Sequence, residues 1–544
     1  MAGPDRQAAW TQQQQAAIEA RGGNILVAAA AGAGKTAVLV ERVLRRITDP
    51  ARPIDLDRLL VVTFTNAAAA EMRERIGGAL NAILERDPAS RPARRQLALL
   101  PRASITTIHS FCLEVLRQHF YHQELDPGFR VADATEAALL QNEALDELFE
   151  RLYREGDESF AQLVDHYGGE RDDSVLQELV IKLYNFSRSH PRPEAWLEEV
   201  AGYFRGAATI EQLPWGRELL HDLEVELTGA RAELQQAGSL ARLPGGPQAY
   251  VPTLENELDL LEKAIAACRR GWDSACCAFQ EISFKRLKAA RDADPALREQ
   301  VQQLRGAARS RLERLRTAFF LRSEAEWLAD LARVGPLMAA LVQLVKDFAA
   351  LFRQLKASRV LVDFSDLEHL CLGVLRETGR YRERFVEVLV DEYQDINPVQ
   401  EAILELVSRG DNRFMVGDVK QSIYRFRLAE PGLFLEKYRR FPPGPGGEGR
   451  RVDLSLNFRS RCPLIEGINL LFKRIMTPYC GELEYDAAAR LVYGADYPEE
   501  DGENLAGGIE LRIIEPGAGR NNPEIEESGL ETAPGATAGD SPET

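Results

Sequence analysis

Apolar runs alternate with helical patterns near both ends of this 544-residue chain. Residues 59–65 and 104–108 are apolar enough for buried strands, and residues 67–80 have the period of an intervening helix. Two more buried strands are predicted at residues 385–391 and 413–418, and each ends in an acidic residue. This alternation predicts an α/β fold of doubly wound character.

The middle of the chain, from about residue 123 to 379, has a different pattern. Long amphipathic helical repeats dominate it, for example at residues 136–153 and 254–270. We therefore predict a large helical insertion inside an α/β domain. After a Pro/Gly-rich linker at residues 442–449, the pattern predicts strands at 451–456 and 508–514. Residues 515–544 lack core-forming side chains and are predicted to be disordered.

The segment 25–36 carries the most informative chemistry. An apolar run stops at a Gly-rich turn that ends in Gly34-Lys35-Thr36, and a helical pattern follows. This is the context of a phosphate-binding loop, in which backbone N–H groups and a helix N-terminus hold a triphosphate. Lys35 would reach the β- and γ-phosphates, and Thr36 would hold Mg²⁺. The nucleotide-binding candidates are Ala29, Ala30, Ala31, Gly32, Ala33, Gly34, Lys35 and Thr36. Ala29 replaces the usual first glycine, and an ordinary Ala/Gly-rich turn is the alternative.

Asp391 and Glu392 follow a predicted strand directly. A carboxylate at the carboxyl end of a parallel strand can supply an oxygen ligand for Mg²⁺, which suits Asp391. Glu392 suits a general base that orients the attacking water. An acidic surface turn is the alternative.

A third cluster lies in residues 417–427. Gln421 follows a strand end, where a side-chain amide could sense a γ-phosphate. Tyr424 and Phe426 alternate with Arg425 and Arg427, a pattern that can stack single-stranded bases. The alternative is an ordinary strand with an aromatic core face, which the spacing alone does not exclude. Arg459 follows the predicted strand at 451–456 and could serve as an arginine finger, although taken alone it is a weak signal.

The overall composition argues against several classes of protein. The formal net charge of −17 argues against a generic nucleic-acid coat protein. The seven cysteines form no Cys-x-x-Cys pairs, so buried, reduced thiols are expected. No apolar run is long enough for a bilayer and the N-terminus has no signal-peptide pattern, so we expect a cytoplasmic protein without a membrane partner. Residues 285–322 carry eleven Lys/Arg against four Asp/Glu and are read as a helix. A solvated face or a duplex-contacting arm would explain that run.

Taken in order, these segments resemble motifs of the superfamily 1 UvrD-like DNA helicases. Residues 10–14 resemble the Q motif, in which Gln14 would read adenine, and residues 29–36 resemble motif I. Residues 63–72 and 107–111 resemble motifs Ia and Ib, and residues 391–400, 417–427 and 457–459 resemble motifs II, III and IV. The resemblance implies single-strand contacts from Phe64, Thr65, Asn66, His109, Tyr424, Phe426 and Arg427. It also implies that Phe458 stacks on adenine and that Arg459 contacts the γ-phosphate, beside Lys35, Glu392 and Gln421 in catalysis.

Within that superfamily, residues 363–369, 419–431 and 491–497 are most similar to the AddA family. The resemblance implies a RecA-like P-loop domain formed by residues 1–122 and 380–441, with a helical insertion at 123–379. Residues 451–514 would begin a second RecA-like domain. Motifs V and VI and a nuclease domain have no counterpart here, so we expect a truncated chain.

The resemblance further implies an ATP- and Mg²⁺-dependent 3′→5′ helicase or translocase in double-strand break repair. Single-stranded DNA, duplex ends and an AddB-type subunit would be its partners. The alternative is a module that binds ATP and DNA without productive turnover. A generic P-loop kinase or transferase is a third reading, but it needs neither Gln14 nor the pair Tyr424 and Phe426.

Overall fold

The computed structural model describes residues 10–497 except residues 170, 445, 446, 480 and 496, together with residues 510 and 512. The chain divides into two compact units, one that runs to Leu454 and one that begins at Ser455. The predicted tail at 515–544 and most of the predicted strand at 508–514 lie outside the described residues.

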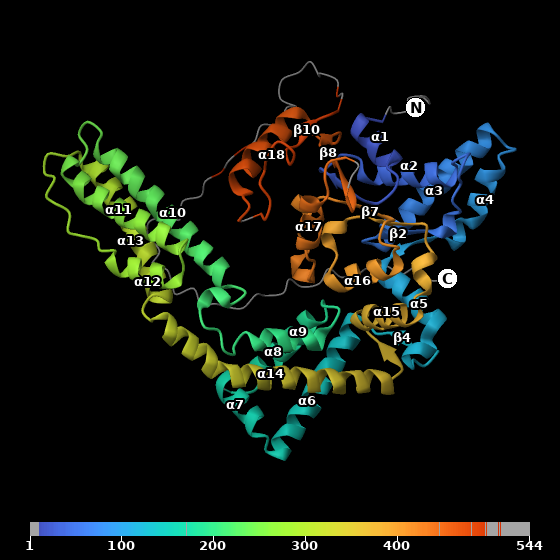
Figure 1. Ribbon diagram of the computed structural model, residues 1–544, viewed down its shortest axis with the longest axis horizontal. Coiled ribbons are helices and arrows are strands. Elements are labelled where there is room, and N and C mark those ends of the chain that lie inside the picture. Colours follow the sequence, from blue (N-terminus) through green and yellow to red (C-terminus); the bar gives the residue numbers. More distant parts are fainter. Residues whose placement is uncertain are drawn as a thin grey trace. The chain divides into compact units, whose positions relative to one another are not determined.

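Six parallel strands form the sheet of the first unit, in the order β3-β2-β6-β7-β1-β8. The strands before the insertion are β1 (Asn24–Ala29), β2 (Leu59–Thr63) and β3 (Ser104–Thr107), and those after it are β6 (Glu387–Val390), β7 (Arg413–Gly417) and β8 (Gly449–Leu454). Figure 1 shows blue and orange strands side by side, so segments from both ends of the unit complete one sheet. The predicted α/β fold is confirmed.

Strand β8 differs from the prediction in its sheet partner. We expected a strand at 451–456 to open a second domain, whereas β8 pairs with β1 from Asn24↔Gly449 to Ala29↔Leu454. The N–H of Ala30 continues this ladder by donating to the carbonyl of Leu454 at 2.8 Å. The pairing satisfies the backbone groups on the outer side of β1, which would otherwise be an unpaired edge. The boundary between the units therefore follows this strand.

The sheet is covered by helices whose starts are fixed by side-chain caps. Thr65 and Thr107 accept the N–H groups of Ala68 and Ser110, which fixes where two helices leave the sheet. The helices around the sheet are α1 (Gln12–Glu19), α2 (Lys35–Ile47), α3 (Asn66–Arg86), α4 (Arg91–Leu99), α5 (Ile108–His119), α15 (Phe364–Thr378), α16 (Pro398–Val407) and α17 (Gly432–Arg440). They hold each strand end, and the loop that follows it, in a fixed position.

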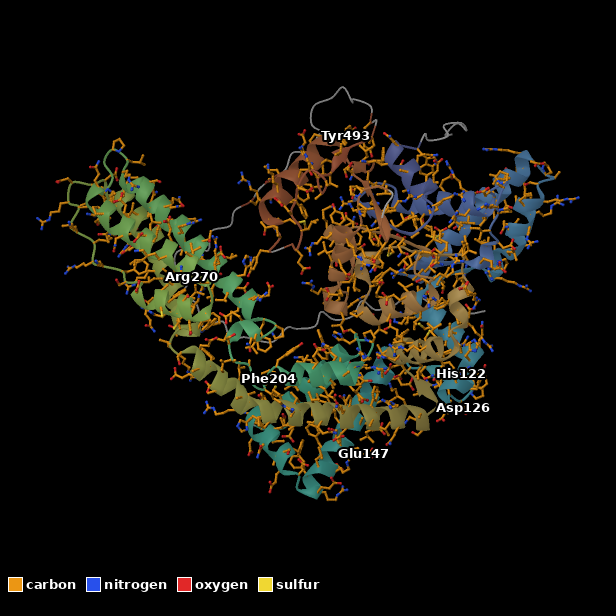
Figure 2. All side chains as sticks on the ribbon, in the orientation of Figure 1. His122, Asp126, Glu147, Phe204, Arg270 and Tyr493 are labelled. Carbon is orange, nitrogen blue, oxygen red and sulfur yellow. The ribbon has the colours of Figure 1, made fainter. Side chains whose placement is uncertain are left out.

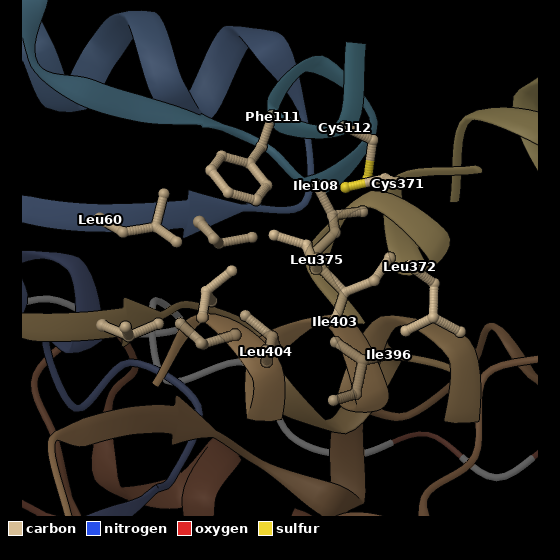
Figure 3. Close-up of a cluster of buried hydrophobic side chains, with 14 of the residues drawn as sticks. Leu60, Ile108, Phe111, Cys112, Cys371, Leu372, Leu375, Ile396, Ile403 and Leu404 are labelled. Carbon is tan, nitrogen blue, oxygen red and sulfur yellow. The ribbon is translucent and has the colours of Figure 1, made fainter. Parts of the chain in front are cut away.

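One apolar core joins the sheet to α5, α15 and α16. Figure 3 shows Leu60 of β2 with Phe111 of α5 and Leu375 of α15 in this core. The sulfur atoms of Cys112 and Cys371 point toward one another there, and burial raises the pKa of the Cys112 thiol well above its usual value. The six cysteines in the described part of the chain are free thiols.

The insertion is helical, and it has two cores of its own. One core joins α6 (Ala134–Glu155), α7 (Glu158–Tyr167), α8 (Ser174–Ser187) and α9 (Pro193–Gly202) to α14 (Glu324–Ser358). The other joins α10 (Gly216–Ala241), α11 (Val251–Cys268), α12 (Trp272–Glu281) and α13 (Pro295–Phe319). Figure 2 marks Glu147 in the first group and Arg270 just after α11. Phe204, also marked, lies so close to α14 that a Cβ on Gly335 would come within 3.0 Å of its carbonyl oxygen.

Two expectations about the insertion need correction. Helix α14 is long and apolar enough to cross a membrane by length and composition, although we expected no such segment. Buried residues of α14, among them Leu341, Val345 and Phe348, pack in the core with α6–α9, and 22% of its apolar 18-residue stretch is buried. The basic run at 285–322 is also not one helix, because residues 282–294 are not helical and α13 begins at Pro295. Arg305 and Arg311 of α13 form ion pairs with Glu257 and Glu226 inside the insertion.

In the described part of the second unit, β9 (Leu456–Asn457) pairs in parallel with β10 (Val492–Tyr493), and α18 (Cys462–Ile475) packs beside them. Asn469 of α18 bonds to both backbone groups of Leu491, donating to its carbonyl at 2.9 Å and accepting from its N–H at 3.0 Å. Tyr493, which Figure 2 marks, belongs to this unit.

Candidate functional site

The candidate phosphate loop leaves the carboxyl end of β1, as the sequence predicts. Gly32 and Gly34 adopt positive φ angles of 70° and 79°, which favour glycine. Helix α2 begins directly after Gly34 and has no side-chain cap, so its first N–H groups are available to an anion. Loop residues 29–34 and the start of α2 therefore have the geometry expected of a phosphate-binding loop.

The side chain of Gln14 is hydrogen-bonded to this loop. Its Oε1 accepts the Thr11 N–H at 3.1 Å, which completes the capping box of α1, and its Nε2 donates to the carbonyl of Ala33 at 3.1 Å. A Cβ on Gly34 would lie 3.3 Å from the same Nε2 atom. Both ends of the Gln14 amide are thus used to fix the loop, and its predicted contact with adenine stays a prediction.

Lys35 and Glu392 form an ion pair across the site, with 2.6 Å between Nζ and Oε2. Lys35 lies at the start of α2, and Glu392 lies just beyond β6, the second strand from β1 in the sheet. Glu392 has a φ of 50°, an unfavourable angle for a side chain of this kind. Such a backbone conformation persists where the surrounding structure enforces it, and it is common at functional sites.

The charged form of two carboxyl groups beside this pair is disfavoured. Burial and the neighbouring Glu392 raise the pKa of Asp391 to about 6, and burial with the same neighbour raises the pKa of Asp395 to about 6. One oxygen of Asp395 is buried without a hydrogen-bond partner. A divalent cation would relieve both effects, so the residues present fit Mg²⁺. No group of three or more His, Cys, Asp or Glu side chains that could hold a metal ion is found in the described ranges.

A chain of hydrogen bonds leads from Glu392 to Gln421. The buried Gln394 donates through Nε2 to Glu392 at 2.9 Å, and its Oε1 accepts the N–H of Asp418 at 2.9 Å. Asp418 in turn accepts from Nε2 of Gln421 at 2.8 Å. The predicted base and the predicted phosphate sensor are thereby linked through two residues to which we had assigned no role.

Three aromatic side chains gather beyond the ends of β2 and β7, and two of them, Phe64 and Phe426, are exposed. The ring centroids of Phe64 and Tyr424 are 4.8 Å apart, and those of Tyr424 and Phe426 are 5.9 Å apart. The guanidinium of Arg427 lies over both rings of the second pair. Phe426 is 75% exposed, and residues 425–427 form a 3-10 turn. The alternative of a strand with an aromatic core face is therefore wrong.

His109 lies on the same edge of the sheet, one strand further along. Its Nε2 is 3.1 Å from a carboxylate oxygen of the buried Glu368, to which Gln400 also donates at 2.8 Å. Asn66 lies within hydrogen-bond reach of Thr107, which caps the helix that carries His109. The candidate contacts at residues 64–66, 109 and 424–427 thus follow the carboxyl ends of β2, β3 and β7.

Phe458 and Arg459 lie in the second unit, directly after β9. Their backbone carbonyls accept hydrogen bonds from the hydroxyl of Tyr497, and Oδ1 of Asn457 accepts the N–H of Arg459 at 2.9 Å. These bonds fix the turn that carries both side chains, and their predicted roles toward a nucleotide stay predictions.

The sequence interpretation missed Gln394, Asp395, Asp418 and Glu368. Gln394 and Asp395 stand inside the acidic motif we singled out, and Asp418 is the acidic residue we noted at the end of a strand. Their roles depend on which loops meet at the edge of the sheet, which periodicity alone does not reveal.

Comparison with known proteins identifies the wider group. Residues 10–442 match the model of the UvrD/REP helicase N-terminal domain. A protein of Pelotomaculum thermopropionicum, named as the A subunit of an ATP-dependent helicase/nuclease, is 52% identical over 97% of this chain and 44% of its own length. Proteins of the same name from Moorella thermoacetica and Bacillus licheniformis are 51% and 48% identical, over 90% and 95% of this chain and 36% and 43% of their own lengths. The chain thus spans less than half the length of these relatives.

Proposed function

The chain belongs to the UvrD/REP helicase family, and we propose that it acts as the ATP-driven motor portion of a DNA helicase of the AddA type. One observation carries the proposal. The Lys35–Glu392 pair of the phosphate site is joined through Gln394 and Asp418 to the loop that presents Tyr424 and Phe426. A protein that converts ATP hydrolysis into movement along DNA needs such a connection between the site that binds ATP and the residues that contact DNA bases.

In the proposed mechanism the phosphate loop binds the triphosphate through its N–H groups, and Lys35 pairs with the β- and γ-phosphates. Thr36 and Asp391 would hold Mg²⁺, which neutralises charge on the phosphates when it is bound. Glu392 would accept the proton of the attacking water, and Gln421 would sense the γ-phosphate. Phe458 and Arg459 of the second unit would contact the base and the γ-phosphate.

Single-stranded DNA would lie across the ends of β2, β3 and β7. Phe64, Tyr424 and Phe426 would stack on bases, while Thr65, Asn66, His109 and Arg427 would contact the strand. We further propose 3′→5′ movement and work at duplex ends during double-strand break repair in the cytoplasm. A partner of AddB type is part of the same proposal, which the relatives' description as one subunit of a helicase/nuclease supports.

Steady-state ATP hydrolysis by the purified chain, with and without single-stranded DNA, tests the proposal. We expect DNA to raise the rate, Lys35→Ala to abolish it, and Phe426→Ala to reduce the stimulation while the basal rate remains. Tyr121→Ala is a matched control, because Tyr121 is a similarly exposed aromatic residue (59%) beyond the far end of α5. ATP binding without DNA-stimulated hydrolysis would refute the proposed motor function. It would favour the alternative, a module that binds ATP and DNA without turnover.

A further inference from the structure

A cavity of about 470 Å³ lies in the insertion, between α8, α9 and α14. Its wall includes four cationic side chains and two carboxylates. Lys346 pairs with Glu198, and Arg188 pairs with Asp366 outside the cavity. Arg192 and Arg353 form no ion pair or side-chain hydrogen bond within the described residues. Arg192, Arg353 and Glu194 are all exposed, so the unpaired side chains of the wall are two cations and one carboxylate.

Helix α9 opens into the same cavity with its N-terminus. Pro193, Glu194 and Ala195 are its first three residues, all three line the cavity, and no side chain caps them. The unpaired N–H groups of a first turn and the positive end of the helix dipole favour an anion. The ten-residue helix and the two arginines therefore direct positive potential into one space.

Tyr184 provides an independent indication of a ligand. It lines the cavity, its side chain is only 5% exposed, and its hydroxyl has no hydrogen-bond partner in the described part of the chain. Phe348 and Phe352 pack edge-on against its ring and fix its position. The hydroxyl of a residue that lines the cavity can donate a hydrogen bond to an oxygen atom of a bound anion.

The cavity is tied to the proposed DNA face through Arg188. Its Nε donates to the hydroxyl of Ser365 at 2.6 Å, and its carbonyl accepts from Nε2 of His369 at 2.8 Å. Glu368 directly precedes His369 on α15, and its carboxylate Oε1 lies 3.1 Å from Nε2 of His109. Helix α15 thus contacts both the cavity wall, at Arg188, and the proposed DNA face, at His109.

We propose that this cavity binds a backbone phosphate of single-stranded DNA, held by Arg192, Arg353, the α9 N-terminus and the Tyr184 hydroxyl. The inference rests on the proposed function and adds to it a contact that positions the strand and does not read its sequence. A free phosphate ion has the same chemistry, but its binding would not require a link to His109.

Binding of a fluorescent oligonucleotide at several salt concentrations, measured by anisotropy without nucleotide, tests the contact. We expect R192A/R353A to weaken binding about tenfold and to lower the slope of log K against log salt by about 0.7 for each phosphate that the variant no longer binds. Tyr184→Phe keeps the ring packing and should weaken binding about two- to tenfold, the value of one hydrogen bond. Arg333→Ala is the control, because Arg333 lies on α14 about 30 Å along the helix from Arg353 and is 77% exposed. It should change neither quantity.

Neutral methylphosphonate linkages, placed one at a time, locate the contact on the strand. The wild-type chain should lose affinity at one or two positions, and R192A/R353A should be insensitive there. Equal affinity and equal salt slope in wild type and both variants would overturn the inference. So would stabilisation of the wild type by inorganic phosphate that depends on Arg353 while DNA binding does not.

Phe426→Ala distinguishes a failure of the cavity assignment from a failure of the proposed function. If Phe426→Ala weakens DNA binding and the cavity variants do not, the cavity assignment fails and the proposed function stands. If the wild-type chain binds no single-stranded DNA, both fail.

Discussion

His369 should make the stability of α15 depend on pH. Burial is the main reason that its pKa falls to about 4, and the nearby Arg188 guanidinium lowers it further. Between pH 6.5 and 4 the unfolded chain therefore binds a proton that the folded chain does not. Stability is complete above pH 6.5 and is lost as the pH falls toward 4, by about 3 kcal/mol in all and about 2 kcal/mol at pH 5.

Hydrogen–deuterium exchange of peptides from α15 measures this effect locally. After correction for intrinsic rates, opening of the helix should be about 20-fold more frequent at pH 5 than at pH 7. His369→Asn should lower protection at both pH values and should remove most of the pH dependence. Equal protection of the wild-type helix at the two pH values, or the same slope in the variant, would refute the reasoning.

Three further predictions concern the amide of Gln394, the metal site and the free thiols. Gln394→Leu should leave nucleotide binding intact but lower DNA stimulation of ATP hydrolysis about tenfold, measured as kcat with and without DNA, because it removes the amide that joins the two loops. Mg·ADP should raise Tm more at pH 8 than at pH 5.5, since the pKa of Asp391 is about 6 and only the carboxylate binds Mg²⁺; Asp391→Asn should remove that difference. A thiol reagent applied to the native chain should modify the exposed Cys277 and spare the buried Cys112 and Cys371, as judged by peptide mass mapping.

Much of the fold could be predicted from the sequence because its signals are local. Strands β2, β6 and β7 are short apolar runs followed by polar residues, and the turn at Gly34 requires a backbone that glycine favours. The position of β8 could not be predicted in this way. Its alternation is equally consistent with either unit, and only the unpaired edge of β1 decides which sheet it joins.

Some residues of the candidate site could likewise be predicted from the sequence, and others could not. Residues such as Lys35, Asp391 and Glu392 could be proposed because their chemistry follows from a short motif in a strand context. Gln394 and Glu368 act through partners 24 and 259 residues away in the chain, at Asp418 and His109. Such pairs form only when several loops meet, so composition and spacing carry no trace of them.

The ion pair between Lys35 and Glu392 bears directly on how the proposed reaction would begin. Each side chain has a proposed task that the pair prevents, because Lys35 must contact phosphate and Glu392 must accept a proton from water. An incoming triphosphate brings negative charge to Lys35 and so competes with the Glu392 carboxylate for it. Glu392 is about one-third exposed and keeps the hydrogen bond from Gln394, so its release costs little desolvation and leaves it oriented. Under the proposed roles, nucleotide binding itself releases the Glu392 carboxylate from Lys35. The same movement displaces the Gln394 amide, which is bonded to Asp418 ahead of the aromatic loop.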